Sequence, residues 1–418
     1  MAAYSTAIPE KSLRVTFTWA LAGNVIYSAS QWLAVVILAK LGNPAVVGEF
    51  ALGLAITAPI VMLTNLQLRT VQATDTGARF AFGDYVALRL LGATAFVLAV
   101  AAVGTRYHGA TLAALLAVAA MKTSESLSDV GYGLLHGRER LDRIAQSQIL
   151  RAAASVCAMW AVIVWTGSCL AGIAALAVAY WLTMMTFDLA LITSAMGARG
   201  WFPAWNWPGI RELFQMSAPL GLTLLLVSLN ANLPRYFLEH YRGVGQVGIF
   251  SALAYVTLSA NLFVMALGQA MMPRMAQASA AGAAAFRRLS GKLFLMAGVV
   301  GALGLAGAAL VGRPLLDLLY GPEYAKEHRV FLWLMFSGVI AHLASAAGYS
   351  LTSARFFRAQ FPILLAVCAV TAGACAILVP KLGTMGAAMA QAGGYAVQFS
   401  CSLAYLVFAM RRRSRAPT

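Results

Sequence analysis

The sequence predicts an all-α polytopic membrane protein, in which about twelve transmembrane helices form two six-helix halves. Hydrophobic residues make up 61% of the chain and charged residues 11%, and the mean hydropathy is +0.77. A soluble domain is nearer half apolar and a quarter charged. The apolar stretches are continuous rather than alternating, which favours helices over a transmembrane barrel. We therefore expect lipid to be the solvent for most of the chain.

Twelve segments are long enough to cross a bilayer, which takes about 20 helical residues. The predicted spans are 15–39, 45–67, 85–105, 110–134, 148–167, 169–196, 215–238, 244–272, 290–312, 328–353, 361–380 and 384–409. The first follows Lys11 and Arg14 and runs well past the length of a signal-peptide core. We therefore expect an uncleaved first helix.

The distribution of positive charge predicts the orientation. The N-terminus, the even-numbered connections and the C-terminal tail contain 21 lysines and arginines, and the odd-numbered connections contain 8. Because short loops rich in lysine and arginine stay in the cytoplasm, both termini are expected there. Much of the net charge of +16 then follows from topology, and binding to nucleic acid is not needed to explain it.

The chain also resembles itself. "VVGEFALGLAIT" (46–57) aligns with "QVGIFSALAYVT" (246–257) at an offset of 200 residues. The identical pairs are Val47/Val247, Gly48/Gly248, Phe50/Phe250 and Thr57/Thr257. Apolar sequences also align by chance, so two interpretations stay open. A true repeat predicts two halves related by a pseudo-two-fold axis along the membrane normal, with a cleft between them.

The repeat and the loop lengths together predict the domain organisation. We expect an N-terminal six-helix lobe over 1–200 and a C-terminal six-helix lobe with a short basic tail over 215–418. A cytoplasmic connection over 201–214, rich in tryptophan, would join them.

The fourth predicted span contains charged residues. Lys122, Glu125 and Asp129 follow the apolar run 110–121, which alone is too short to cross a bilayer. Spacings of three and four place all three side chains on one face of a helix. At about 1.5 Å per residue, Lys122 lies roughly 18 Å into the span. A charge at that depth costs at least about 2.5 kcal/mol and ordinarily faces a water-filled cavity or a partner.

Three interpretations of this face are open. In the first, Lys122 and Glu125 satisfy each other and only fix the helix in place. In the second, the face lines a wet cavity and touches substrate or a coupling ion. In the third, the span boundary is misplaced and the stretch lies in water.

Four further polar residues lie in or beside predicted spans. Arg235 either snorkels to the outer interface or faces a cavity. Asp188 and His342 are each either a buried hydrogen-bonded residue or a functional group, and Arg69 is expected at the cytoplasmic rim. The candidates for the substrate cavity are Lys122, Glu125, Asp129, Arg235, His342 and Arg69. The candidates for proton or sodium coupling are Asp188, Glu125 and Asp129. The basic members would suit an anionic headgroup.

Several classes of activity lack support in the sequence. It contains no P-loop, GxSxG, HExxH or GxGxxG motif, and the loops leave no room for a soluble catalytic domain. The five cysteines lack metal-ligand spacing. We therefore expect neither an enzyme nor a bound cofactor or metal.

Several stretches resemble the polysaccharide-transporter branch of the multidrug/oligosaccharidyl-lipid/polysaccharide exporter superfamily, the O-antigen (Wzx-type) and capsule flippases. They are "LAKLGNPAVVGEFALGLAITAPIVMLTNLQLR" (38–69), "YGLLHGRERLDRIAQSQILR" (132–151), "SAPLGLTLLLVSLNANLPRYFLEHYRGVGQVGIFSALAYV" (217–256), "LLYGPEYAKEHRVFLWL" (318–334) and "VPKLGTMGAAMAQAGGYAV" (379–397). The resemblance covers nearly the whole chain. The family shares no diagnostic residue triad, so no residue role is carried over.

The resemblance implies a function. Members have twelve helices in two halves around a cationic cavity. They move polyprenyl-diphosphate-linked oligosaccharide from the inner to the outer leaflet by alternating access. The implied partners are that lipid-linked sugar, membrane lipid, and the polymerase or export machinery of O-antigen, capsule or exopolysaccharide.

Other functions remain as alternatives. A multidrug/toxin cation antiporter of the same superfamily should line its cavity with carboxylates and aromatic residues, whereas the embedded charge here is mixed. A lipid II flippase usually has two further helices. A membrane enzyme such as an O-antigen polymerase usually carries a large outer loop, and the longest outer connection here, 313–327, is short.

Overall fold

Membrane-length helices make up the computed structural model, which describes residues 13–75, 77, 79–197 and 201–415. Every regular element within these ranges is a helix. Eleven helical segments of the described chain are long and apolar enough to span a membrane. The eighth predicted span lies in a further helix, α10 (Val244–Ala281), whose 38 residues exceed one bilayer crossing. The chain is thus an integral membrane protein, and the predicted all-α polytopic fold class is confirmed.

Each predicted span lies within the observed helical segment to within two residues, but several helices extend beyond the predicted ends, by up to nine residues at the end of α10. The long helices besides α10 are α1 (Leu13–Leu41), α2 (Pro44–Asn65), α4 (Phe82–Gly104), α5 (Gly109–Gly137), α6 (Leu141–Thr166), α9 (Trp207–Arg242), α11 (Ala283–Leu319), α13 (His328–Ser353), α14 (Phe357–Leu382) and α15 (Thr384–Arg415). The shorter ones are α3 (Leu68–Thr74), α7 (Cys169–Thr183), α8 (Leu189–Met196) and α12 (Pro322–Ala325).

A π-helical segment interrupts the sixth predicted span. The sequence predicts one helix over 169–196, and the structure has α7, then the π-helix η1 (Met184–Asp188), then α8. A π turn holds about one residue more than an α turn, and such insertions occur frequently at functional sites. Asp188 is the last residue of η1 and is buried.

The contacts group the described residues into two compact units. Unit 1 comprises the described parts of Met1–Ala34, Thr64–Val103 and Ala117–Gly221. Unit 2 comprises those of Val35–Leu63, Gly104–Leu116 and Leu222–Thr418. The predicted lobes with a connection at 201–214 stay a prediction.

In unit 1, apolar side chains from four helices form one core. Leu68 of α3, Leu88 of α4, Val130 of α5 and Leu213 at the beginning of α9 are all buried in it. A second cluster joins α5 to α6 through Tyr132 and neighbouring apolar residues. Both cores include apolar side chains from the second half of α5, the part of the helix that carries the charged face.

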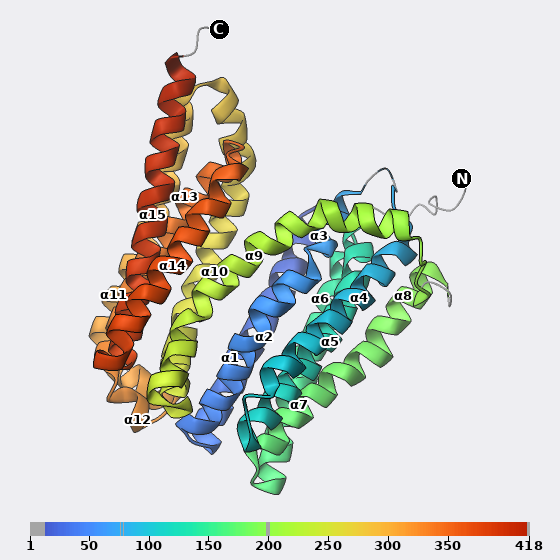
Figure 1. Cartoon of the computed structure of the whole chain (residues 1–418), viewed down its shortest axis with the longest axis vertical. Coiled ribbons are helices and arrows are strands. Elements are labelled where there is room, and N and C mark those ends of the chain that lie inside the picture. Colours follow the sequence, from blue (N-terminus) through green and yellow to red (C-terminus); the bar gives the residue numbers. More distant parts are fainter. Residues whose placement is uncertain (1–12, 76, 78, 198–200, 416–418) are drawn as a thin grey trace. The chain divides into compact units, whose positions relative to one another are not determined.

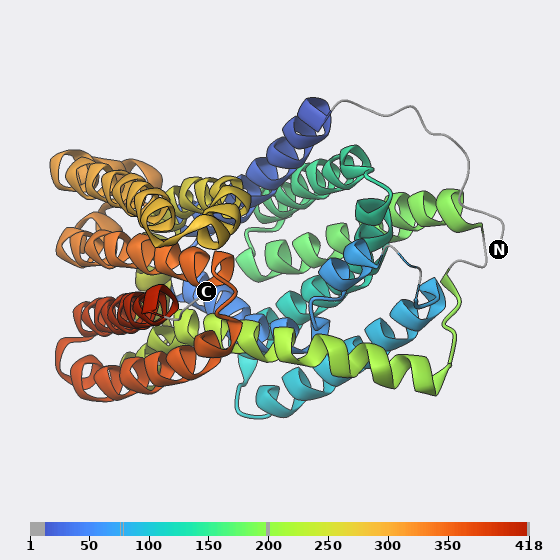
Figure 2. The same ribbon diagram turned by 90° about the horizontal axis from the view of Figure 1, so that it is seen from above.

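In unit 2, the C-terminal helices pack along their lengths. Both views show α13 beside α15, and α13 lies between α11 and α15 in Figure 2 (Figures 1 and 2). Val264 of α10, Leu293 of α11 and Ala346 of α13 are fully buried in their shared core.

The repeat-related glycines meet at a reciprocal backbone contact within unit 2. A Cβ added to Gly48 of α2 would lie 1.9 Å from the carbonyl oxygen of Val244, and one added to Gly248 of α10 would lie 1.9 Å from that of Pro44. Each oxygen belongs to the residue four positions before the opposite glycine. A two-fold axis relating the two helices would produce this reciprocal pair of contacts. Only glycine, which has no Cβ, permits the backbones to approach so closely.

We expect Gly248→Ala to destabilise the protein, because the added methyl group meets a backbone oxygen that no side-chain rotation can move aside. Overpacking of this kind costs about 1–3 kcal/mol. Gly245→Ala is the matched control in the same helix, since a Cβ there meets nothing within 4 Å. Thermal unfolding of the purified protein in detergent should show a lower midpoint for Gly248→Ala alone. Equal midpoints for the two variants would contradict the contact.

Candidate functional site

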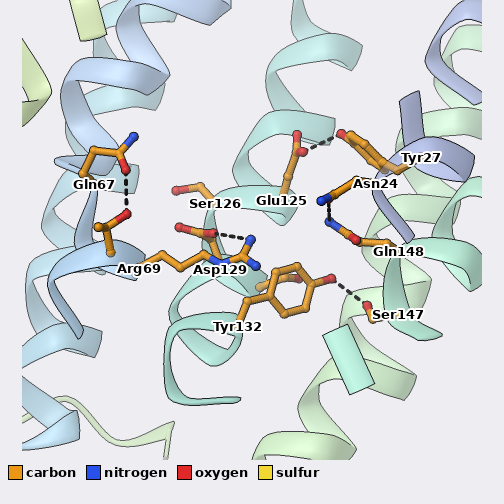
Figure 3. A network of polar contacts seen from close by, with 12 residues as sticks. Asn24, Tyr27, Gln67, Arg69, Glu125, Ser126, Asp129, Tyr132, Ser147 and Gln148 are labelled. Carbon is orange, nitrogen blue, oxygen red and sulfur yellow. Dashed lines mark hydrogen bonds and ion pairs between the residues drawn. The ribbon is translucent and has the colours of Figure 1, made fainter. Parts of the chain in front are cut away.

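The charged face of α5 is engaged in ion pairs. The Lys122 ammonium lies 2.7 Å from Oε2 of Glu125. Oε1 of Glu125 accepts a hydrogen bond from the hydroxyl group of Tyr27 at 2.5 Å (Figure 3). The Lys122–Glu125 pair of the first interpretation is therefore present, and Glu125 is also hydrogen-bonded to Tyr27 of α1.

Asp129 lies one turn further along α5 and binds two arginines. Its Oδ2 is 2.8 Å from the guanidinium of Arg89 on α4. Its Oδ1 is 3.8 Å from the guanidinium of Arg69 on α3 (Figure 3). Arg89 also donates to Ser126 at 3.3 Å, and Ser126 donates to Asn65 at 2.5 Å. A single carboxylate thus connects α5 with α3 and α4.

Asp188 binds an arginine from a different helix. Oδ2 of Asp188 is 2.5 Å from the guanidinium of Arg151 on α6. Ser147 donates to Oδ1, and Arg151 also donates to Ser128 of α5 at 2.7 Å. The π-helical segment η1 is therefore fastened to both α5 and α6 through one ion pair.

Two tyrosine rings join these pairs. The guanidinium carbons of Arg69 and Arg151 lie 5.6 and 5.9 Å from the ring centre of Tyr132, a distance at which cation–π attraction acts. Arg151 also lies 5.3 Å from the ring of Tyr180, whose hydroxyl accepts a hydrogen bond from Gln31. We call this connected set the α5 cluster. Its charged members are Arg69, Arg89, Lys122, Glu125, Asp129, Arg151 and Asp188.

The α5 cluster has a buried layer and an accessible layer. The buried side chains, each 1–2% exposed, are those of Arg89, Arg151 and Asp188. The accessible side chains, between 18% and 31% exposed, are those of Lys122, Glu125, Asp129 and Arg69. The buried layer can only position its neighbours, whereas the accessible layer can meet a ligand.

Arg89 and Arg151 were not predicted as site residues. Each lies within the first five residues of a predicted span, at 85 and at 148, where positive charge ordinarily marks the cytoplasmic boundary. In the structure both lie well inside their helices and are buried. The available signal was that the sequence offers Asp129 and Asp188 no partner within their own helices, so a cation on another helix had to supply one.

The other two candidates lie in unit 2. Arg235 on α9 donates to Ser251 at 2.9 Å, to the carbonyl oxygen of Ala231 at 3.0 Å and to Asn232 at 3.1 Å. All three partners are neutral, and no carboxylate of the described chain lies within ion-pair distance. His342 on α13 is buried, and its Nδ1 has no hydrogen-bond partner among the described residues. No hydrogen bond within the described chain joins it to Arg235.

The charged side chains of the α5 cluster are suited to recognising a charged ligand. The α5 cluster contains four basic and three acidic side chains, and the surplus cation favours an anionic ligand. Arginine presents a planar fork that matches a phosphate or carboxylate group. Among the described residues, no group of three histidine, cysteine or acidic side chains could hold a metal ion.

Comparisons with known proteins agree with this architecture. A family model for polysaccharide biosynthesis proteins matches residues 83–279. The capsular polysaccharide biosynthesis protein CapF of Staphylococcus aureus is 23% identical over 375 residues, which are 89% of this chain and 94% of CapF.

Two solved structures show a similar fold. The lipid II flippase MurJ, in an inward closed conformation, superimposes with a TM-score of 0.75 at 10% identity and covers 94% of this chain and 87% of its own. An inward-facing multidrug resistance transporter of the MATE family gives 0.69 at 12% identity, with 98% and 97% covered.

The fold of this chain is thus similar to that of a MATE family multidrug resistance transporter and of the lipid II flippase MurJ. In sequence, the chain is similar to polysaccharide biosynthesis proteins, through the family match and through CapF. The resemblance seen in the sequence motifs is thus confirmed.

Removing Arg151 should cost far more stability than removing Lys122. Arg151→Met leaves Asp188 buried and unpaired, at a cost of about 3–5 kcal/mol. Lys122→Met breaks a pair that is partly exposed, which costs about 1 kcal/mol or less. Thermal unfolding in detergent compares the two. The double variant Arg151→Met/Asp188→Leu should recover most of the loss, and its failure to do so would show that the ion pair is not the cause.

Proposed function

We propose that this protein is a flippase for polyprenyl-diphosphate-linked oligosaccharide, acting in the assembly of a surface polysaccharide. It works in the bacterial cytoplasmic membrane with both termini in the cytoplasm. The lipid-linked headgroup enters a cationic site, the polyprenyl tail stays in lipid, and alternating access carries the headgroup to the outer leaflet. The family match and the structural likeness to a lipid II flippase support this class of transport.

One observation supports an anionic cargo most directly: within the described helices, positively charged side chains inside the membrane outnumber the carboxylates that pair with them. Among the residues that the structure describes, the hydrogen-bond partners of Arg235 are all neutral, although a charge without a counter-ion is costly in this environment. A diphosphate supplies the missing negative charge and accepts several hydrogen bonds from a guanidinium. In unit 1, Lys122 and Arg69 are accessible and belong to a cluster with one more cation than carboxylates.

The same geometry disfavours a cation antiporter. An exported organic cation needs a carboxylate that is free to bind it. Within the described residues, Glu125, Asp129 and Asp188 are each already held by lysine or arginine. Binding a cation there would require breaking an existing pair.

The cargo can be tested in the native host with the gene deleted. Lipid-linked oligosaccharide is labelled, and its leaflet distribution and the surface polysaccharide are measured. The proposal requires accumulation on the cytoplasmic leaflet and loss of surface polysaccharide, both reversed by the wild-type gene. Normal surface polysaccharide without accumulation, in a host with no second transporter, overturns it and directs attention to drug efflux.

In this assay, Lys122→Gln and Arg235→Gln should each lower translocation about tenfold or more. A hydrogen bond to a charged group contributes about 1.5–3 kcal/mol, and each 1.4 kcal/mol corresponds to a factor of ten. Lys326→Gln removes a positive charge from an exposed position outside both sites and should transport normally. Equal loss in all three variants would indicate a general effect of charge on insertion rather than binding.

We assign ion coupling, where transport depends on a proton or sodium gradient, to Glu125. Its partner Lys122 is a point charge on a flexible stem, whereas Asp129 and Asp188 bind arginines, which stay protonated. In membrane vesicles, Glu125→Gln should remove the dependence of transport on the gradient, as measured with an ionophore. Glu323→Gln, which neutralises an exposed acid, is the control and should retain it. A Glu125→Gln protein as sensitive to the ionophore as the wild type would refute the assignment.

A further inference from the structure

A second cationic feature of unit 1 lies where α5 turns into α6. Arg138, Arg140 and Arg143 line a pocket of about 360 Å³, within the range of about 300–1,000 Å³ that ligand pockets occupy. The other lining residues are Leu135, Leu191, Ser194 and Ala195. None of the lining residues belongs to the α5 cluster, and none is acidic.

The turn itself brings the arginines together. α5 ends at Gly137 and α6 begins at Leu141, so three residues reverse the chain. Glu139 adopts a left-handed conformation with a φ of 58°, and the amide of Arg140 donates to the carbonyl oxygen of Leu135 at 2.8 Å. Because the reversal is so tight, side chains before and after it line the same pocket.

The guanidinium groups are held in defined positions. Arg138 donates to the carbonyl oxygen of Ala195, at the end of α8, at 3.1 Å. Arg140 grips Asp142 through two hydrogen bonds at 3.1 and 3.3 Å. Arg143 is exposed and donates to the neutral amide of Gln146 at 3.2 Å. Cations fixed in this way lose little freedom when they bind a phosphate group.

The pocket lies at the level of lipid headgroups. It is built where three membrane spans end together, at Gly137 of α5, Leu141 of α6 and Met196 of α8. Leu135 and Leu191 add apolar surface beside the arginines. A free inorganic anion gains nothing from an apolar wall, whereas a lipid phosphate carries hydrocarbon close to its charge.

We propose that this pocket binds the phosphate group of an anionic lipid. Basic pockets between membrane-spanning helices are known to take such headgroups. The phosphate can come from a bilayer phospholipid or from a polyprenyl-diphosphate carrier, and both present the same chemistry to the arginines. The proposal concerns binding at the membrane surface and does not depend on the transport activity.

Native mass spectrometry of the full-length protein in detergent tests the proposal. The probes are phosphatidylglycerol and a diacylglycerol with the same acyl chains but no phosphate. The wild type should retain phosphatidylglycerol and not diacylglycerol. Arg140→Gln/Arg143→Gln should bind phosphatidylglycerol about tenfold or more weakly. Arg211→Gln, which neutralises an exposed arginine near the beginning of α9, should bind it like the wild type.

A third probe, polyprenyl diphosphate, distinguishes the two sources of phosphate. Displacement of phosphatidylglycerol by this lipid from the wild type, but not from the double variant, identifies the carrier as the preferred occupant. Failure to displace it identifies the bilayer phospholipid. Equal retention of phosphatidylglycerol by the wild type and the double variant overturns the proposal. If the double variant melts at a lower temperature than the wild type, its weaker binding could reflect unfolding. The single variant Arg143→Gln then replaces it in the comparison.

Discussion

The neutralisation of charge inside the membrane governs the structure of unit 1. A charged side chain near the bilayer centre costs several kcal/mol unless a partner or water compensates it. The α5 cluster meets this cost by pairing each carboxylate with a cation from its own or a neighbouring helix. The helices that contribute those cations cannot separate from α5 without exposing a charge to lipid. Electrostatics therefore fixes α5 where packing of similar apolar side chains alone would leave several arrangements open.

The same requirement explains which features could be predicted from the sequence. The spans follow from continuous apolar stretches, since only helices satisfy their own backbone in lipid. The face of α5 follows from the spacing of Lys122, Glu125 and Asp129, because helical geometry is local. The partners Arg89 and Arg151 could not be found in this way, since pairing between helices depends on tertiary contacts. The π-helical segment was also missed, because its five residues are ordinary apolar and polar residues in a helical context.

The membrane-embedded arginines of the two units have different partners, and this difference says more about the cargo than the fold does. Flippases and multidrug transporters share this architecture, so fold alone does not select a substrate. In the α5 cluster of unit 1, the buried Arg89 and Arg151 are each paired with a carboxylate. In unit 2, Arg235 donates to hydroxyl, carbonyl and amide oxygens. Neutral oxygen atoms orient a guanidinium without cancelling its charge. Under the proposed function, Arg235 is thereby kept in place for a ligand that brings its own negative charge.

The π-helical segment η1 makes the register of the sixth span unusually sensitive to chain length. Each residue of an α-helix advances about 100° around the axis, so deleting one residue from η1 would rotate α8 by about that angle against α7. Ile192 of α8 now lies against Gly131 of α5, where an added Cβ would come within 2.0 Å of its side chain. After the rotation the side chain of Ile192 would no longer point toward Gly131. An apolar span commonly absorbs a small change in length by tilting, but this one would lose a specific contact. Evolution can therefore substitute residues within η1 far more readily than it can shorten it.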